Sequence, residues 1–286
     1  MSIELPPGTA DYSDRTPTTS NRAVLKLLAL FFATIIVVIW LAGAIANSLI
    51  GLIPPQAEQA LGKAIVPAYE AQALPSPTQD TLNQMLDQLE QHLPPEMQEG
   101  RDFQVFYVPQ DVINAVAIPG DRVIIYQGLL EQAESENELM MVLGHELGHF
   151  ENRDHIRGLG QKILLRLAIA SIFGDVGTLG SIAASGVTAL SDSQFSQKQE
   201  RQADEVGLDL LNQVYGQVAG ATDFFARMSE KQGLEIAFLA SHPTSASRVR
   251  RIESLIQKRG YSVGERSPLP PPLTNLPAPR PSGSSG

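Results

Sequence analysis

The strongest feature of the hydrophobic pattern is an apolar run near the start of the chain. It extends from Val24 to Ile53, and after Lys26 it carries no charge for 27 residues. About 20 apolar residues in a helix cross the hydrocarbon core of a bilayer, and a run without a polar face does not suit the surface of a water-soluble domain. The pattern therefore predicts one transmembrane helix, assigned to residues 23–53, after a disordered polar tail over residues 1–22.

Two interpretations of this helix remain open. Ala44-Ile45-Ala46 is similar to a signal-peptide cleavage site, whereas the long preceding segment and the continuation to Ile53 favour an uncleaved signal anchor. The orientation is the same in both cases, because three basic residues precede the run and one follows it within twenty residues. Positive charge stays in the cytoplasm, so we expect the bulk of the chain on the periplasmic side of the inner membrane. The four basic residues are Arg15, Arg22, Lys26 and Lys63.

Downstream of the run, the pattern predicts a linker and then four helices. Residues 54–79 contain five prolines and are assigned to the linker, with one short helix in it. The first of the four helices has Thr78 as its N-cap, and the second begins at a capping box of Ser135 and Glu138. The four helices cover Leu82 to Leu93, Ser135 to Arg153, residues 193–215 and residues 244–259.

Short apolar runs predict a small antiparallel sheet. Residues 103–108 have the pattern of a strand, and the runs at 112–118 and 122–127 flank Pro119-Gly120-Asp121, which is typical of a hairpin. The predicted fold class is therefore α+β, with a mainly helical domain over residues 80–262.

Two other segments lack a core-forming pattern of this kind. Residues 163–190 are apolar but interrupted by charges and glycines, so soluble packing helices or a patch on the membrane surface fit them better than a second span. Residues 263–286 are rich in Pro, Ser and Gly and are assigned to a disordered tail.

Composition changes this picture in two ways. The chain has 21 Lys and Arg against 31 Asp and Glu, a formal net charge of -10. This balance argues against nucleic acid as a partner, because phosphate binding needs a basic surface. The absence of cysteine excludes disulfides, thiolate zinc sites, iron–sulfur clusters and a cysteine nucleophile. Histidine chemistry must come from His92, His145, His149, His155 and His242.

One pentapeptide has the spacing of a metal site. His145-Glu146-Leu147-Gly148-His149 has the form H-E-x-x-H, in which residues i and i+4 share one helix face. Both imidazoles can therefore bind one zinc ion. Glu146 lies about 100° further round the helix and is suited to act as a general base on a water beside the metal. The alternative is a core helix with two buried histidines, where Leu would be the less costly residue because buried polar groups need partners.

A catalytic zinc site has three protein ligands, and two residues can supply the third. His155 lies six residues after His149 and reaches the metal only after a tight turn at Asn152, a residue type that tolerates left-handed geometry. Glu200 lies on a separate predicted helix. Asp204, one turn later on the same face, can accept a ring N–H from a ligand histidine. The spacing leaves both candidates open.

The order of these and other short motifs resembles that of the HtpX-like and CAAX-prenyl-protease-like zinc metallopeptidases, which are membrane-associated gluzincins. The similarity covers about residues 80–257. It rests on Asn114-Ala115, Pro119-Gly120, Gly128-Leu129-Leu130, His145–His149, Asn152-Arg153, His155, Glu200-x-x-Ala203-Asp204, Ser241-His242-Pro243 and Arg248. The chain departs from the multi-span members of this family, because it has one clear span.

The resemblance carries expectations for individual residues. It implies that Glu200, rather than His155, is the third ligand of one Zn²⁺ per chain, and that His242 approaches the oxyanion developing on the substrate. Asp204 and Arg248 are expected around the ligands.

The resemblance also carries expectations for fold and substrate. It implies a zincin-type domain in which the strand around Asn114 and Ala115 lines the cleft and pairs with an extended peptide. The predicted partners are therefore unfolded or extended protein substrates, together with the membrane that holds the N-terminal helix.

The predicted function is that of a membrane-anchored zinc metalloendopeptidase, with a role in envelope protein quality control that rests on family analogy. Glu146 is the expected general base. A non-catalytic zinc-containing module that binds a client in the same cleft is the alternative, and the intact Glu146 counts against it. A metal-free helical protein is a third hypothesis, and it predicts no bound zinc.

Overall fold

The computed structural model describes residues 21–50, 55–158, 194–231, 236–243 and 246–279. The chain divides into two units, Met1–Ile45 and Ala46–Gly286, which are described separately. The predicted tail up to residue 20, the apolar segment 163–190 and the last residues of the chain from 280 lie outside the described residues.

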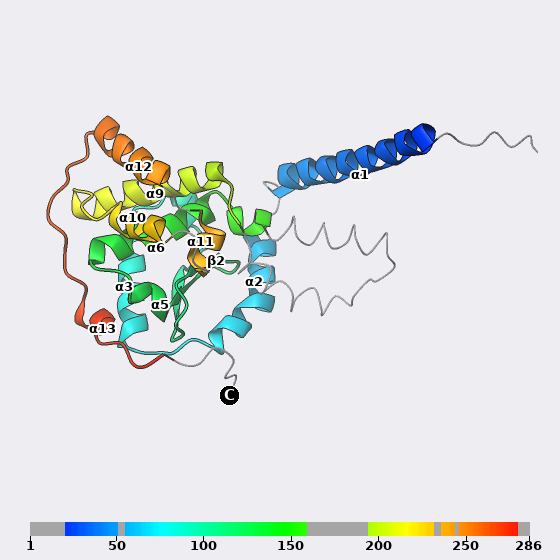
Figure 1. Ribbon diagram of the computed structural model, residues 1–286. Coiled ribbons are helices and arrows are strands. Elements are labelled where there is room, and N and C mark those ends of the chain that lie inside the picture. Colours follow the sequence, from blue (N-terminus) through cyan, green and yellow to red (C-terminus); the bar gives the residue numbers. More distant parts are fainter. Residues whose placement is uncertain (1–20, 51–54, 159–193, 232–235, 244–245, 280–286) are drawn as a thin grey trace, which may run out of the picture. The chain divides into compact units, whose positions relative to one another are not determined.

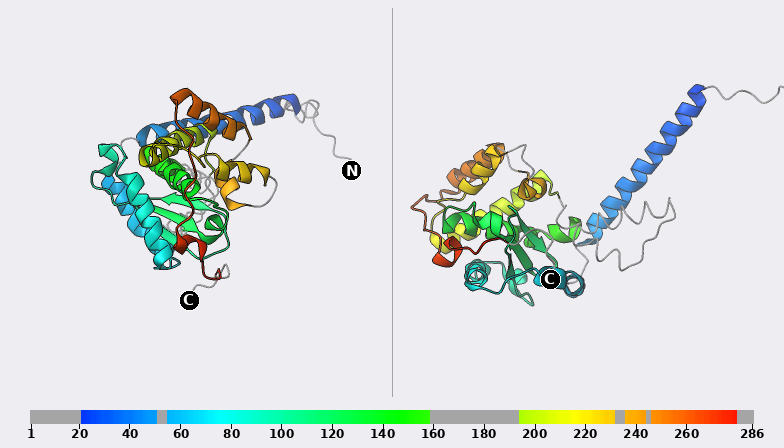
Figure 2. Two further views of the ribbon diagram at one scale, coloured as in Figure 1. Left: turned by 90° about the vertical axis from the view of Figure 1, so that its left-hand side faces the viewer. Right: turned by 60° about the horizontal axis from the view of Figure 1, so that its bottom comes forward.

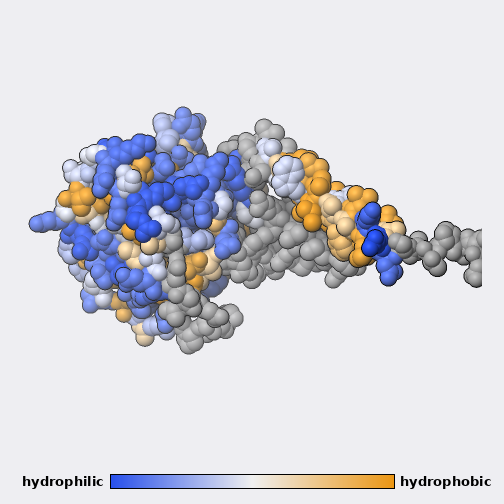
Figure 3. Space-filling view, turned by 45° about the horizontal axis from the view of Figure 1, so that its top comes forward, coloured by the Kyte–Doolittle hydropathy of each residue, from blue (hydrophilic) through white to orange (hydrophobic). Residues whose placement is uncertain are grey.

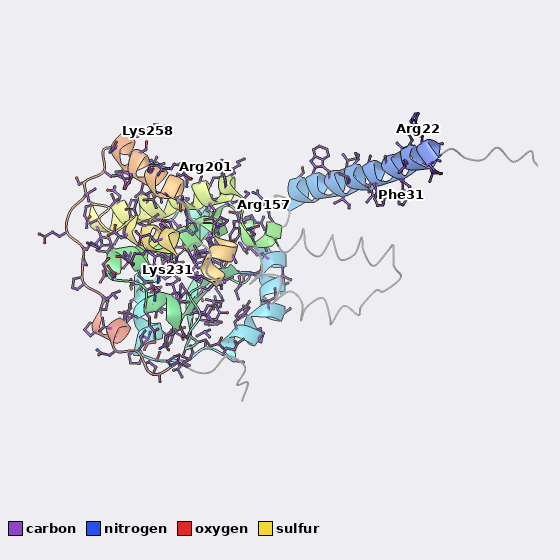
Figure 4. The ribbon with its side chains drawn as sticks, in the orientation of Figure 1. Arg22, Phe31, Arg157, Arg201, Lys231 and Lys258 are labelled. Atoms are coloured by element: carbon purple, nitrogen blue, oxygen red, sulfur yellow. The ribbon has the colours of Figure 1, made fainter. Side chains whose placement is uncertain are left out.

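Helix α1 (Asn21–Ile50) carries the apolar run. Its large apolar side chains are exposed, from Val24 at 42% to Trp40 at 69%. They form the orange surface in Figure 3, and Phe31 projects from the helix in Figure 4. By length and composition, Asn21–Ile45 is one candidate membrane span. The helix that the hydrophobic pattern predicts over residues 23–53 is therefore present in the structure as α1.

A three-stranded sheet lies in the second unit, with the order β1-β3-β2. Its strands are β1 (Gln104–Val108), β2 (Ala115–Ile118) and β3 (Arg122–Tyr126). Strands β2 and β3 form the predicted antiparallel hairpin, but β1 pairs with β3 in parallel. The sheet is therefore mixed, and the expectation of an antiparallel sheet is wrong for β1. Residues 109–114 carry the chain across the sheet, and alternation within a strand does not reveal which neighbour the strand will take.

Both faces of the sheet are covered, and alternate strand residues divide between them. On one face, Val105, Tyr107, Val123 and Ile125 join the main core with helix α3 (Pro77–Glu90) and helix α6 (Glu136–Glu151). On the other face, Phe106, Val108, Ile124 and Tyr126 pack against helix α2 (Pro55–Glu70). Figures 1 and 2 show the strands between α2 and α3. Period-two alternation with both faces apolar produces this layer.

Helix α2 corrects the assignment of residues 54–79 to a linker. It is sixteen residues long, and its Ile65 and Tyr69 are each 1% exposed. Gly62 lies so close to the hairpin turn that an added Cβ would sit 2.5 Å from the Gly120 Cα. The prolines suggested a linker, but Pro55 is the first residue of the helix, where proline is favoured, and Pro67 lies only in its last turn.

Helix α9 (Gln197–Tyr215) packs closely against α6 (Figure 1). A Cβ added at Gly144 would lie 3.0 Å from the Gly207 Cα, and one added at Gly148 would lie 2.7 Å from the Ala203 Cα. The small residues at these contacts allow the two helix backbones to approach closely, so side chains on α9 reach those on α6. Ser135 caps α6 by accepting from the Glu138 N–H, and Ser196 and Gln199 form the capping box of α9.

The remaining helices of the described residues are short, apart from α12. They are α4 (Pro95–Gln98), α5 (Gln127–Leu130), α10 (Asp223–Glu230), α11 (Ala237–Ser241), α12 (Ala246–Arg259) and α13 (Pro271–Thr274). The predicted helices at 193–215 and 244–259 correspond to α9 and α12. Helix α3 is capped by Ser76, whose hydroxyl accepts from the Gln79 N–H, so the cap lies two residues before the predicted Thr78.

The segment after α12 is packed against the domain rather than disordered as far as residue 279. Figure 1 shows it passing along the domain from α12 to α13. Ser267 donates its N–H to Asn137 and accepts from the Glu136 N–H, and Leu273 is 2% exposed. The predicted tail is therefore wrong for residues 263–279. Proline has no N–H to satisfy, so a Pro-rich segment can pack in extended form on other elements.

Candidate metal centre

Helix α6 brings the two motif histidines together on one face. His145 and His149 are fully buried, and their Nε2 atoms lie 3.1 Å apart. The two rings meet edge to face with their centroids 4.7 Å apart. A spacing of four residues on a helix produces this arrangement.

Helix α9 brings a carboxylate to the same point. Glu200 is 2% exposed. Its Oε1 lies 3.5 Å from His149 Nε2, and its Oε2 lies 3.7 Å from His145 Nε2. Glu200 stands in the first turn of α9, where the close packing on α6 sets its carboxylate opposite both imidazoles. Its neighbour Arg201 is exposed on the outer side of α9 (Figure 4).

A third histidine reaches the cluster just after α11. His242 Nδ1 lies 3.2 Å from His145 Nε2 and 3.1 Å from Glu200 Oε1. The Phe238 ring stacks on His242 with a centroid distance of 4.8 Å. Ligand atoms of His145, His149, Glu200 and His242 all lie within 4.8 Å of one another. The cluster therefore contains the two motif histidines, the glutamate candidate and the histidine expected near the substrate.

His155, the other candidate for the third ligand, is directed elsewhere. It is buried, and its Nε2 lies 2.7 Å from Glu58 Oε1 on α2. The tight turn after α6 occurs at Arg153, which has a φ of 56°, and not at Asn152, which keeps right-handed helical geometry. The reversal at Arg153 turns His155 towards α2.

Each α6 histidine has a carboxylate behind its ring. His145 Nδ1 lies 3.1 Å from Asp204 Oδ1, as the position of Asp204 one turn after Glu200 predicts. His149 Nδ1 lies 3.0 Å from Asp154 Oδ2. Asp154 is fully buried, and sequence reasoning missed it. A ligand histidine usually donates its second ring N–H to a carboxylate, so an aspartate close behind His149 was the available signal.

Glu146 has one bonded and one free carboxylate oxygen. Its Oε2 accepts the Ala117 N–H of β2 at 3.0 Å. Its Oε1 has no hydrogen-bond partner among the described residues, and His242 Nε2 lies 3.6 Å from it. The side chain is fully buried. A buried carboxylate oxygen thus faces the space beside the histidines, where a proton acceptor is useful.

The donor atoms fit a zinc ion. When both Nδ1 atoms donate to carboxylates, His145 and His149 present bare Nε2 lone pairs to each other at 3.1 Å. The Glu200 carboxylate faces the same point, so three electron-rich groups converge there, and a cation between them relieves the repulsion. Nitrogen and carboxylate oxygen donors without thiolates are a set that zinc accepts.

Arg248 sets the charge around the cluster. It donates from Nε to Asp204 at 3.0 Å and approaches Glu200 Oε2 at 2.5 Å, while its guanidinium lies 4.3 Å from the Phe225 ring centroid. Burial raises the pKa of the Glu200 carboxyl, but Arg248 holds this pKa well below its usual range. Burial also raises the pKa of Asp204, but Arg248 and His145 beside it lower this pKa overall. Both carboxylates are therefore ionised at neutral pH.

The two histidines respond differently to their surroundings. Burial lowers the pKa of His145. Burial also opposes protonation of His149, but hydrogen bonds with Asp154 and Glu200 raise its pKa to about 9. The point between His149 and Glu200 therefore favours positive charge.

Asn114 and Ala115 lie at the start of β2. Asn114 is buried, and its Oδ1 accepts the Ala115 N–H at 3.0 Å. Ala115 is paired with Ile125 of β3. Among the described residues the sheet order β1-β3-β2 leaves β2 at an edge, and the strand reaches Glu146 through Ala117, two residues beyond Ala115.

Comparison with known proteins identifies similar chains. The family model for Peptidase family M48 matches residues 78–256. Metalloprotease LoiP of Escherichia coli (strain K12) is 33% identical over 161 residues, covering 54% of this chain and 62% of LoiP. Mitochondrial metalloendopeptidase OMA1 of Schizosaccharomyces pombe is 29% identical over 147 residues, covering 49% of this chain and 42% of that protein.

A third relative is similar over a comparable part of the chain. Beta-barrel assembly-enhancing protease of Yersinia pestis is 25% identical over 160 residues, covering 51% of this chain and 33% of that protein. The chain thus matches between about a third and two thirds of the length of these relatives. The match to the family model, over residues 78–256, includes all four residues of the histidine cluster.

Proposed function

Because this chain belongs to peptidase family M48, a family of zinc metallopeptidases, we propose that it is a zinc-dependent endopeptidase that hydrolyses peptide bonds of protein substrates. Family membership confirms the resemblance to zinc metallopeptidases that the motifs carry. The observation that supports the activity most directly is the convergence of His145, His149 and Glu200 beside a Glu146 oxygen that has no hydrogen-bond partner among the described residues.

The proposed roles follow from these contacts. His145, His149 and Glu200 hold the metal, and Asp204 and Asp154 fix the two imidazoles through their Nδ1 atoms. The zinc, when bound, supplies a Lewis acid for the scissile carbonyl and for the attacking water. In this assignment one zinc ion binds per chain.

Glu146 is the proposed general base. Its free oxygen takes a proton from water as the water attacks the carbonyl carbon, and the same oxygen passes the proton to the leaving amine. The Ala117 N–H holds the other oxygen and so orients the carboxylate. His242, whose Nε2 lies 3.6 Å from Glu146, is assigned to the developing oxyanion on the basis of the family resemblance.

The substrate is proposed to be an unfolded or extended polypeptide. β2 lies at an edge of the sheet in the part of the chain that the structure describes, and an extended peptide can add to such an edge through main-chain hydrogen bonds. The Ala117 N–H already bonds the general base, so a peptide aligned along the strand from Asn114 would pass the catalytic carboxylate. Backbone pairing of this kind gives loose side-chain specificity. The name of the beta-barrel assembly-enhancing protease is compatible with a role in envelope quality control.

The proposed location is a bacterial inner membrane, with the catalytic unit on the periplasmic side. Asn21–Ile45 supplies the candidate span, and the excess of basic residues before it favours a cytoplasmic N-terminus. A phosphatase or fluorescent reporter fused after Ser267 tests this orientation. Phosphatase activity is expected, and fluorescence of a reporter that folds only in the cytoplasm would reverse the topology and remove the envelope substrates.

The activity is tested with Glu146→Gln. The variant should retain about one zinc per chain and lose hydrolysis of casein by orders of magnitude, because the general base and the metal act as one unit. Glu70→Gln, an exposed position on α2, is the matched control and should cleave at the wild-type rate. Cleavage by Glu146→Gln at the wild-type rate contradicts the mechanism. Wild-type protein that binds zinc and unfolded casein but never cleaves it indicates the binding module instead.

A further inference from the structure

Glu58, a buried carboxylate on α2, contacts two arginines and one histidine that lie outside the metal cluster. Glu58 is 1% exposed. Its Oε2 lies 3.1 Å from Arg101 Nη2 and 3.1 Å from Arg153 Nη2, and its Oε1 lies 2.7 Å from His155 Nε2. The mechanism proposed above uses none of these four groups. A buried charge is tolerated when it is paired and hydrogen-bonded. Glu58 has three such partners.

Two of these partners lie on either side of Asp154. Arg153 and His155 both reach back to the one Glu58 carboxylate, so the residue between them is held from both sides. Asp154 points the opposite way, with its Oδ2 3.0 Å from His149 Nδ1. Its second oxygen accepts from Gln199 Nε2 at 2.7 Å. The loop therefore has two opposed sets of bonds, one to α2 and one to the metal cluster.

The loop needs such support because its backbone is unusual. Arg153 has a φ of 56°, a left-handed conformation that non-glycine residues seldom adopt and that persists where surrounding contacts fix it. The Glu58 contacts to Arg153 and His155 supply that fixation. A loop released from Glu58 can relax at Arg153, and Asp154 then loses its alignment with His149.

Helix α2 gives Glu58 a rigid base. Gly62, one turn after Glu58, touches the hairpin turn at Gly120, and Ile65 and Tyr69 are buried against the sheet. Arg101 also approaches Asp121 of the hairpin at 3.2 Å. Glu58 is thus held by the sheet on one side and holds the loop on the other.

From these contacts we infer that Glu58 is a positioning residue for the metal centre: through Arg153 and His155 it fixes Asp154, and Asp154 fixes the His149 imidazole. The inference rests on the proposed function in that His149 binds zinc. It gives helix α2, which the prolines suggested to be part of a linker, a supporting role for the metal centre. It also gives His155 a role that is not metal ligation.

The test is the zinc dissociation constant of detergent-solubilised full-length chains, measured at 25 °C by competition with a chelator. Loss of a carboxylate that orients a ligand histidine typically weakens metal affinity 10–100-fold. Asp154→Asn should show a loss of about that size, and Glu58→Gln should show a similar or smaller one. The double variant should bind zinc about as weakly as Asp154→Asn alone, because Glu58 acts through Asp154.

Two further variants separate positioning from general stability. Ile65→Ala removes buried apolar contacts of α2 without touching Glu58, so it should lower the melting temperature and leave zinc affinity within about twofold. Arg153→Gln removes one of the two links, and it keeps the test decisive if Glu58→Gln does not fold. Its zinc affinity should fall between those of the wild type and Asp154→Asn.

The outcomes are distinct. Wild-type zinc affinity in both Glu58→Gln and Arg153→Gln overturns the inference, and so do losses that multiply in the double variant. Equal weakening by Ile65→Ala and Glu58→Gln also overturns it, because the effect then comes from loosening α2. A wild-type chain that binds no zinc refutes the proposed function itself, and this result is recognised without any of the variants.

Discussion

Helices α1 and α6 both contain long apolar stretches, but they differ in exposure and in the ionisable groups that they carry. Most large apolar side chains of α1 between Val24 and Ile45 are exposed, with Phe31 at 59% and Trp40 at 69%. Every residue of α6 from Asn137 to Phe150 is buried. The apolar run of α1 carries no charge, whereas α6 holds the charged or polar groups of His145, Glu146 and His149 inside the domain. The candidate span is therefore an uncharged apolar stretch, whereas the buried helix α6 combines apolar residues with ionisable ones.

The difference lies in where the polar groups find partners. In the membrane position proposed for α1, a polar group would face lipid, where each unsatisfied group costs several kcal/mol. In α6, His145 and His149 each meet a carboxylate, and Glu146 meets the Ala117 N–H. The buried polar atoms of α6 are thus tolerated because neighbouring elements supply complementary atoms. The following predictions test this comparison.

The largest expected effect comes from removing a metal donor that faces α6. Glu200→Ala should lose most of the zinc and all measurable proteolysis, because one of three converging donors disappears and Arg248 is left buried beside the gap. Asp204→Asn should weaken zinc affinity about 10–100-fold through His145. His155→Ala should keep the zinc, with some loss of affinity through the loop. Metal content and casein cleavage are measured on all three variants under the same conditions.

The reverse order would refute the ligand assignment. If His155→Ala emptied the site and Glu200→Ala left it filled, then the third ligand would be the histidine. His92→Ala, at an exposed position after α3, is the matched histidine control and should retain wild-type zinc content and activity.

A new positive charge should affect the two helices differently. Leu143 in α6 is fully buried, and Leu143→Arg places an unpaired charge in the core, with an expected loss of more than about 4 kcal/mol and of the folded state. Val37 in α1 is 53% exposed. Val37→Arg should leave zinc content and the melting transition of the domain unchanged in detergent, while membrane insertion becomes about 2.5–3.5 kcal/mol less favourable.

The readouts are differential scanning calorimetry and the fraction of protein that resists carbonate extraction. Val37→Leu serves as the control for the position and should behave as the wild type. A wild-type melting transition in Leu143→Arg would show that α6 has access to solvent. Unfolding of the domain by Val37→Arg would show that α1 supports the domain directly.

Local signals in the sequence predicted the α6 part of the site, because they depend on contacts within one helix. The spacing of His145 and His149 follows from helix geometry, and the Ser135 cap follows from the first turn. Asp204 was predicted because it lies one turn from Glu200 on the same face. These features need no knowledge of how distant elements pack.

The features that sequence reasoning missed depend on packing between distant elements. The parallel pairing of β1 with β3 and the burial of α2 arise from the choice among surfaces of similar hydrophobicity, which alternation does not encode. Asp154 became recognisable only when the turn at Arg153 directed it back to His149. His155 was a plausible ligand until Glu58, nearly a hundred residues earlier in the chain, was placed beside it. The packed segment 263–279 resembled a disordered tail because its prolines and serines are common in both.

The last expected effect is a pH dependence of the free energy of unfolding, and it comes from Glu58 on α2. Burial raises the pKa of Glu58, but the hydrogen bond and charge of His155, with Arg101 and Arg153, lower it to about 2 from the usual 4.5. A depressed carboxyl pKa stabilises the folded state above pH 4.5, and this contribution is lost as pH falls from about 4.5 to about 2. The free energy of unfolding of the metal-free wild type should therefore fall relative to that of Glu58→Gln by on the order of 2–4 kcal/mol across this window. Urea unfolding at matched pH values measures the difference, and Glu70→Gln should follow the wild type. A difference between the wild type and Glu58→Gln that stays constant from pH 6 to pH 2 would show that folding does not lower the pKa of Glu58.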